Sequence, residues 1–187
     1  MAAFSKPNTP HRDHGAAPSQ QRLAEMLRVN HAGEYGAVRI YAGQQRFARS
    51  TRQRALVAEM GMHEQAHLAS FNQLLADRRV RPSLLLPLWH VAGYGLGAVT
   101  ALMGDAAAMA CTEAVETVIE QHYNNQLTTL RGHDDALAAT IQQFKEEEVA
   151  HKDLASAEGA ANAPAYPVLT GLIKLGSRLA IKLSEKL

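Results

Sequence analysis

The feature that most constrains the fold is a repeated spacing of glutamate and histidine. Two Glu-x-x-His motifs occur, at positions 64–67 and 148–151, and a single glutamate precedes them by 30 and 32 positions. The six residues of the pattern are Glu34, Glu64, His67, Glu116, Glu148 and His151. Because residues i and i+3 project from one face of a helix, each motif can present a carboxylate and an imidazole to one metal ion. The spacing predicts two similar halves, each made of two antiparallel helices.

The rest of the chain favours an all-helical fold. From Gln21 onward the sequence is rich in Ala, Leu, Gln, Glu and Arg, with no β-branched run alternating at period two. Ser19 and Asp134 can serve as N-caps, Gly132 can follow a helix C-terminus, and Pro164 separates the last two helices. The helices are expected over residues 19–49, 51–77, 105–130, 134–158 and 168–186.

The connection between the second and third bundle helices decides the topology. About 27 residues separate them, and the stretch 84–103 carries no formal charge and is itself expected to be helical. We therefore predict an all-α, ferritin-like four-helix bundle with a long helical crossover over 84–103 and an extra C-terminal amphipathic helix over 168–186. Residues 21–187 would form this one domain. Residues 1–20, with three prolines and few large apolar side chains, are expected to be a disordered tail.

Charge and cysteine content narrow the function classes. With 19 basic and 18 acidic residues the formal charge is +1, which argues against nucleic acid as a partner. Cys111 is the single cysteine, so no intrachain disulfide can form and a reducing compartment is favoured. The first twenty residues lack the continuous apolar stretch of a signal peptide, so we expect a cytoplasmic protein.

Two glutamates and two Glu-x-x-His motifs that face the interior of a bundle are the ligand set of a carboxylate-bridged di-iron or di-manganese centre. Glu64 and Glu148 would be the bridging ligands. Single glutamates on helices are usually solvated, and His63 competes with the pattern because it shares a helix face with His67. Other neighbours within a turn or two are Glu59, Glu113, Glu120, His122, Glu146 and Glu147. We expect Glu146 and Glu147 to be the solvated side of a charged run.

Longer phrases around these residues point to one family. They include HAGEYGA around Glu34, HEQAHLASFNQLL around Glu64, HYNNQ after Glu116, FKEEEVAHKD around Glu148, and LLPLWHVAGYGLGA in the crossover. From about Leu23 to the C-terminus the chain closely resembles the demethoxyubiquinone hydroxylase family. Glu113 is a departure, since family members can carry an apolar residue there.

The resemblance implies a di-iron monooxygenase of ubiquinone biosynthesis that uses O2 to hydroxylate the ring of a polyprenylated methoxy-methyl-benzoquinol. It places the family's iron ligands on all six residues of the pattern above. It also places His122 and Tyr123 on a motif associated with electron delivery, from NADH or another donor. Ordinary helix packing is the alternative role for His122.

A polyprenylated substrate partitions into lipid, so the enzyme needs a route from the bilayer. Residues 82–104 pass without a formal charge and contain Trp89 and Tyr94, and we expect them to lie in the membrane interface rather than to span it. The last helix is expected to bind the membrane surface. Its apolar side comprises Leu169, Leu172, Ile173, Leu179 and Leu183, and its basic residues are Lys174, Arg178, Lys182 and Lys186.

These features predict a peripheral protein on the cytoplasmic side of the cell membrane. A homodimer and other proteins of ubiquinone biosynthesis are further partners to consider. Three alternatives stay open: a basic last helix that only caps the bundle, an iron-oxidising or peroxide-consuming bundle, and a metal-free quinone-binding scaffold. The apolar crossover and the amphipathic helix argue against the second.

Overall fold

The computed structural model describes residues 17–187 and, within them, contains helices and no strands, as predicted. The α-helices are α1 (Gln20–Phe47), α2 (Thr51–Asp77), α3 (Leu86–Met103), α4 (Asp105–Leu130), α5 (Asp135–Ala157) and α6 (Tyr166–Lys186), with a short 3-10 helix, η1 (Ala160–Asn162). Most of the expected tail, residues 1–16, lies outside the described part of the chain. Gln20, the last residue of that tail, already begins α1.

Local capping chemistry explains the helix ends. The Ser19 hydroxyl accepts a hydrogen bond of 3.1 Å from the backbone N–H of Arg22, and the Asp134 carboxylate accepts one of 3.1 Å from Leu137. Gly132, just beyond α4, has a φ of 79°, a left-handed conformation that glycine adopts without a steric cost. One end differs from expectation: α6 begins at Tyr166, because Pro167 is tolerated in the first turn of a helix.

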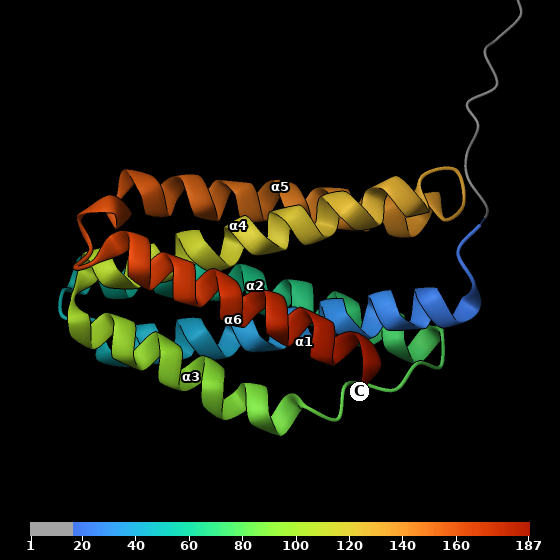
Figure 1. Cartoon of the computed structure of the whole chain (residues 1–187), viewed down its shortest axis with the longest axis horizontal. Coiled ribbons are helices and arrows are strands. Elements are labelled where there is room, and N and C mark those ends of the chain that lie inside the picture. The colour runs from blue at the N-terminus through green and yellow to red at the C-terminus, as the bar shows by residue number, and fades with distance from the viewer. Residues whose placement is uncertain (1–16) are drawn as a thin grey trace, which may run out of the picture.

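Four helices, α1, α2, α4 and α5, form the bundle (Figure 1). α1 and α2 run antiparallel, and α3 then carries the chain back along α1, so that α4 runs in the same direction as α2. α6 packs across α4 and α1 on the same side of the bundle as α3. This is the predicted arrangement of a four-helix bundle with one helical crossover and one added helix.

The crossover helix packs tightly on α1. A Cβ on Gly97 would clash with the carbonyl oxygen of Ile40, and a Cβ on Gly43 would clash with the carbonyl oxygen of Tyr94. Glycine at both positions lets the two helix backbones approach each other closely. By length and composition α3 is the one helix within residues 17–187 that could cross a membrane, and 28% of it is buried in the fold.

Two apolar clusters divide the bundle interior along its length. One contains Leu27 of α1, Phe71 of α2, Leu127 of α4 and Ile141 of α5. The other contains Tyr41, Val57, Ala108 and Ala155 from the same four helices. On every one of these helices, the residues of the Glu/His pattern fall between the two clusters in sequence. Apolar packing at both ends therefore fixes the position of a polar layer at mid-bundle.

Candidate metal centre

The six residues of the sequence pattern meet in the middle of the bundle. Their ligand atoms form two groups, Glu34, Glu64, His67 and Glu148 in one and Glu64, Glu116, Glu148 and His151 in the other. Within each group the ligand atoms lie within 4.8 Å of one another. Glu64 and Glu148 belong to both groups, the position expected for carboxylates that bridge two metal ions.

All six side chains are withdrawn from solvent, with exposed fractions of 1–4%. The alternative that these glutamates are solvated surface residues is therefore wrong. Buried carboxylates without compensating positive charge are strongly unfavourable in a protein interior. Their burial together is the first indication that this layer is built to hold cations.

The histidines point their Nδ1 atoms at the carboxylates. Nδ1 of His67 lies 3.1 Å from Oε1 of Glu148 and 3.4 Å from Oε2 of Glu34. Nδ1 of His151 lies 3.1 Å from Oε1 of Glu64 and 3.4 Å from Oε2 of Glu148. Each motif therefore contributes one imidazole nitrogen to the shared layer of oxygens.

The pKa shifts show how much negative charge this layer concentrates. Burial and repulsion from neighbouring carboxylates, Glu148 among them, raise the pKa values of Glu34, Glu64 and Glu116. Burial acts to lower the pKa of His67, but the hydrogen bonds to Glu148 and Glu34 raise it to about 11. The layer therefore favours positive charge beside its carboxylates.

Several buried polar atoms of the cluster have no hydrogen-bond partner among the described residues. They are Oε2 of Glu34, Oε1 of Glu64, Oε2 of Glu148 and Nδ1 of His151. Oε1 of Glu64 and Nδ1 of His151 lie 3.1 Å apart but without the geometry of a hydrogen bond. Such atoms are rare in folded proteins and call for an ion or another partner. Carboxylate oxygens and imidazole nitrogens without thiolate suit iron or manganese. The donor set therefore fits two divalent cations, and four carboxylates would neutralise their four positive charges.

Two buried tyrosines donate hydrogen bonds to Glu34 and Glu116, the carboxylates that belong to one group only and are called terminal below. The Tyr41 hydroxyl on α1 donates a hydrogen bond of 3.0 Å to Glu116 on α4, and the Tyr123 hydroxyl on α4 donates one to Glu34 on α1. Sequence reasoning identified Tyr123 but missed Tyr41. A signal was present, because each tyrosine follows the single glutamate of its own helix by seven positions.

Three other candidate residues near the pattern, Glu113, Glu120 and His122, do not contact the cluster. Glu113 accepts a hydrogen bond of 2.9 Å from the Tyr166 hydroxyl, and Glu120 forms an ion pair with Lys152. His122 points its Nε2 at Oδ1 of Asn30, 3.0 Å away, and not at a member of the cluster. Burial, with a smaller contribution from Arg22, lowers the pKa of His122 to about 4.

Two further side chains, Glu147 and His63, contact the outer ring nitrogens of the cluster histidines. Oε2 of Glu147 is 2.6 Å from Nε2 of His67, and Nδ1 of His63 is 3.0 Å from Nε2 of His151. The expectation that Glu147 is simply solvated is therefore wrong, whereas Glu146 is exposed as expected. His63 shares the helix face of His67, yet it contacts the outer nitrogen of His151 and does not replace either histidine in the cluster.

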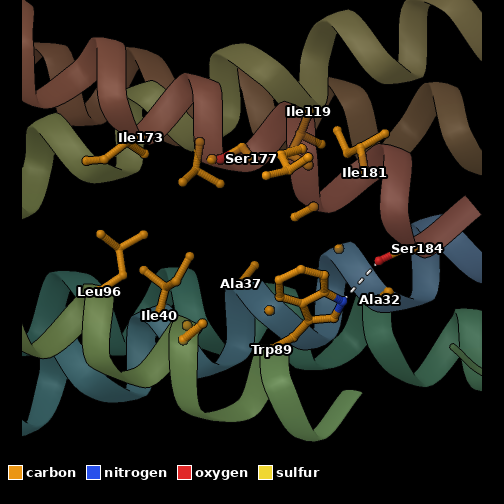
Figure 2. A pocket seen from close by; sticks show the side chains of 18 of the residues that line it. Ala32, Ala37, Ile40, Trp89, Leu96, Ile119, Ile173, Ser177, Ile181 and Ser184 are labelled. Atoms are coloured by element: carbon orange, nitrogen blue, oxygen red, sulfur yellow. Dashed lines mark hydrogen bonds between the residues drawn. The ribbon is translucent and has the colours of Figure 1, made fainter. Parts of the chain in front are cut away.

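A large apolar cavity of about 640 Å³ lies beside the Glu/His layer, between α1, α3, α4 and α6. Figure 2 shows Ile40 and Ala37 of α1 facing Ile119 and Ile173 across it, with the indole N–H of Trp89 bonded to the Ser184 hydroxyl at one end. Gly33 and Val115, which also line the cavity, are sequence neighbours of Glu34 and Glu116. Only the thickness of α1 and α4 therefore separates the cavity from the carboxylates.

Several named proteins are similar to this chain over most of its length, and their names share one function. The chain is 51% identical to a 3-demethoxyubiquinol 3-hydroxylase of Rhodospirillum rubrum over 171 residues, which are 90% of this chain and 81% of that protein. It is 47% identical to the mitochondrial NADPH-dependent 3-demethoxyubiquinone 3-hydroxylase of Homo sapiens, covering 90% of this chain and 80% of that protein. It is also 42% identical to the mitochondrial 5-demethoxyubiquinone hydroxylase of Saccharomyces cerevisiae, covering 88% and 78%.

The model of one protein family matches residues 21–184, which span all six α-helices apart from the ends of α1 and α6. The residues matched include both groups of the Glu/His layer and the four helices that line the cavity. The chain thus belongs to the family described as ubiquinone biosynthesis protein COQ7.

Proposed function

We propose that this protein is a di-iron monooxygenase that hydroxylates the ring of demethoxyubiquinol, a polyprenylated methoxy-methyl-benzoquinol, in ubiquinone biosynthesis. The observation that carries the proposal is the buried layer of four carboxylates and two histidines. The names of the relatives at 42–51% identity, all hydroxylases of demethoxyubiquinol or demethoxyubiquinone, support the substrate class.

In this proposal Glu34 and His67 hold one iron ion, Glu116 and His151 hold the other, and Glu64 and Glu148 are shared. When bound, the two iron ions supply the activation of O2. One oxygen atom enters a ring C–H bond and the other leaves as water, which consumes two electrons and two protons from a donor. The protein's own contribution is to position the ring and exclude water from this chemistry.

The hydrogen bonds of Tyr41 and Tyr123 restrain the two terminal carboxylates, so that each keeps one oxygen oriented toward the centre. Tyr123 also lies next to His122, with ring centroids 6.0 Å apart. We assign this pair to the delivery of electrons. A reduced nicotinamide is the donor we favour, because the names of several relatives describe them as NADPH-dependent.

The apolar cavity is the place that we propose for the first isoprene units of the tail. Its volume of about 640 Å³ falls within the range of small-molecule sites, and its lining is almost wholly apolar. Several of the leucines that line it are also exposed on the surface: Leu88, Leu172, Leu179 and Leu183. A tail in the cavity would therefore be continuous with the exterior between α3 and α6.

The exterior of α3 and α6 supports a peripheral position on the membrane. Exposed apolar residues follow one side of α6: Val168, Leu172, Leu175, Leu179 and Leu183. This row differs from the expected apolar side, because Ile173 packs into the core and Leu169 packs against it. On α3, Leu88, Val91 and Val99 are more than half exposed. Together with the basic residues of α6, these side chains suit the cytoplasmic surface of a bilayer.

The test of the reaction is a quinone profile, by liquid chromatography and mass spectrometry, of cells that lack this gene and any second hydroxylase. Demethoxyubiquinone should accumulate, and the wild-type gene should relieve it. Glu148→Ala should not, because it removes a carboxylate shared by both groups. Glu113→Gln, which keeps an oxygen for Tyr166, is the matched control and should complement. Normal ubiquinone in the deleted strain, or complementation by Glu148→Ala, would contradict the proposal.

Flotation with liposomes of anionic and neutral lipid tests the membrane position. The full-length protein should float with the liposomes. Leu172→Ser combined with Leu179→Ser should reduce flotation, whereas Ser156→Ala, on the exposed side of α5, should not. Equal flotation of all three proteins would argue against α6 as a membrane contact.

A further inference from the structure

The outer ring nitrogens of the two histidines have different partners. Behind His67, the carboxylate of Glu147 lies 2.6 Å from Nε2. Behind His151, Nδ1 of His63 lies 3.0 Å from Nε2, and the two rings are nearly parallel, with centroids 5.3 Å apart and an angle of 10° between them. Both partners come from the side of the bundle formed by α2 and α5, away from the apolar cavity.

If Nδ1 of each histidine binds a metal ion, the donor and the acceptor of each of these contacts are fixed. The proton of the neutral imidazole must then be on Nε2, so His67 donates to Oε2 of Glu147 and His151 donates to Nδ1 of His63. A carboxylate acceptor makes a ligand imidazole more basic and adds negative charge close to the metal ion. An imidazole acceptor brings no negative charge.

A second contact restrains Glu147. Nε2 of Gln143 donates a hydrogen bond of 3.0 Å to Oε1 of Glu147, one helical turn away. The preceding pair repeats this pattern without reaching the cluster, since Gln142 donates a bond of 2.7 Å to Glu146. Helix α5 therefore contains two similar Gln–Glu pairs. The pair Gln143–Glu147 contacts His67 of the Glu/His layer, and the pair Gln142–Glu146 does not.

We propose that Glu147 and His63 are positioning residues for His67 and His151, and that the difference in their charge makes the two halves of the metal site unequal. The half that contains Glu34 and His67 binds its ion more tightly, and the half that contains Glu116 and His151 binds its ion more weakly. This inference rests on the proposed function, because it requires the buried layer to hold metal ions.

The experiment is an anaerobic titration of the metal-free, full-length protein with ⁵⁷Fe(II), followed by calorimetry and Mössbauer spectroscopy. Wild type should bind two ions in two steps, with the first equivalent giving one quadrupole doublet and the second giving another. Glu147→Gln should weaken the tighter step by roughly 10- to 100-fold and change the first doublet. His63→Phe keeps an aromatic ring without an acceptor and should weaken the other step alone.

Glu146→Gln is the matched control and should bind as wild type does. Should Glu147→Gln fail to fold, as judged by circular dichroism of the metal-free protein, Gln143→Ala replaces it with Gln142→Ala as its control. Gln143→Ala should then weaken the tighter step several-fold.

Two equal steps in wild type, or an unchanged titration of Glu147→Gln, would overturn this inference and leave the proposed function intact. A wild-type protein that binds no iron would overturn the proposed function as well.

Discussion

The hydroxyl of Tyr41 donates a hydrogen bond of 3.0 Å to Oε1 of Glu116, joining α1 to α4 through the centre of the bundle. The bond from Tyr123 to Glu34 joins the same two helices in the opposite sense. In each half of the chain, a tyrosine therefore restrains the terminal carboxylate of the other half. The repetition extends the symmetry of the Glu/His layer beyond its six members.

Removing one of these hydroxyls should weaken the site without unfolding the protein. Tyr41→Phe leaves Oε1 of Glu116 without its donor, so the carboxylate is less well oriented and more easily protonated. We expect iron affinity and hydroxylation rate to fall by about tenfold. Tyr35→Phe is the control, because Tyr35 bonds His90 outside the cluster. Equal losses in both variants, or none in Tyr41→Phe, would show that the bond has no role at the site.

A larger side chain in the apolar cavity should raise KM for a long-tailed substrate and not for a tail-less one. Gly36 lines the cavity, and a Cβ there would have no atom within 4 Å. Gly36→Leu should displace about two methylene groups of a tail and raise KM for a long-tailed quinol about tenfold. KM for a tail-less analogue should stay unchanged. Gly95→Leu, whose Cβ is also free of contacts but lies outside the cavity lining, should alter neither value. A rise in KM for both substrates would argue against a tail site here.

Helix–helix packing at the crossover gives a prediction on stability. Gly97→Ala forces a Cβ against the carbonyl of Ile40, and we expect it to destabilise the fold by about 1–3 kcal/mol. Gly95→Ala meets no atom within 4 Å and should be neutral or stabilise α3 by up to about 1 kcal/mol. Urea unfolding followed by circular dichroism measures both values. Equal free energies of unfolding for Gly97→Ala and Gly95→Ala would contradict the close packing of α3 on α1.

His122 gives the pH dependence of the fold a defined sign. Burial lowers its pKa from 6.5 to about 4, so between these values the unfolded chain binds a proton that the folded protein excludes. Stability should therefore fall as pH drops from about 6.5 to 4, by about 3 kcal/mol from this residue. His122→Gln should show a shallower decline in the free energy of unfolding over this range. Parallel curves for the two proteins would show that His122 titrates normally in the fold.

The helices could be predicted because their ends are determined locally. Ser19, Asp134 and Gly132 act within one turn of their own helix, so the sequence alone locates them. The meeting of the six cluster residues could be predicted for a different reason. Their spacing repeats between the two halves, and a shared face at the same height of a bundle accounts for such a repeat.

The surroundings of the cluster could not be predicted in the same way. Glu147 lies in a run of three glutamates, and its partner His67 is 80 positions away on another helix. Which glutamate of the run faces that histidine depends on how α5 is rotated against α2, which a single helix does not reveal. The apolar cavity likewise results from the packing of four helices, and its lining residues read as ordinary core in the sequence.

The most direct test of the central claim is a single turnover of the purified, Fe(II)-loaded protein with demethoxyubiquinol under ¹⁸O2. The account predicts hydroxylated quinol that carries one ¹⁸O atom, in wild type and not in Glu148→Ala. Product of normal mass, or equal product from both proteins, would contradict the assignment of this buried layer to O2-dependent ring hydroxylation.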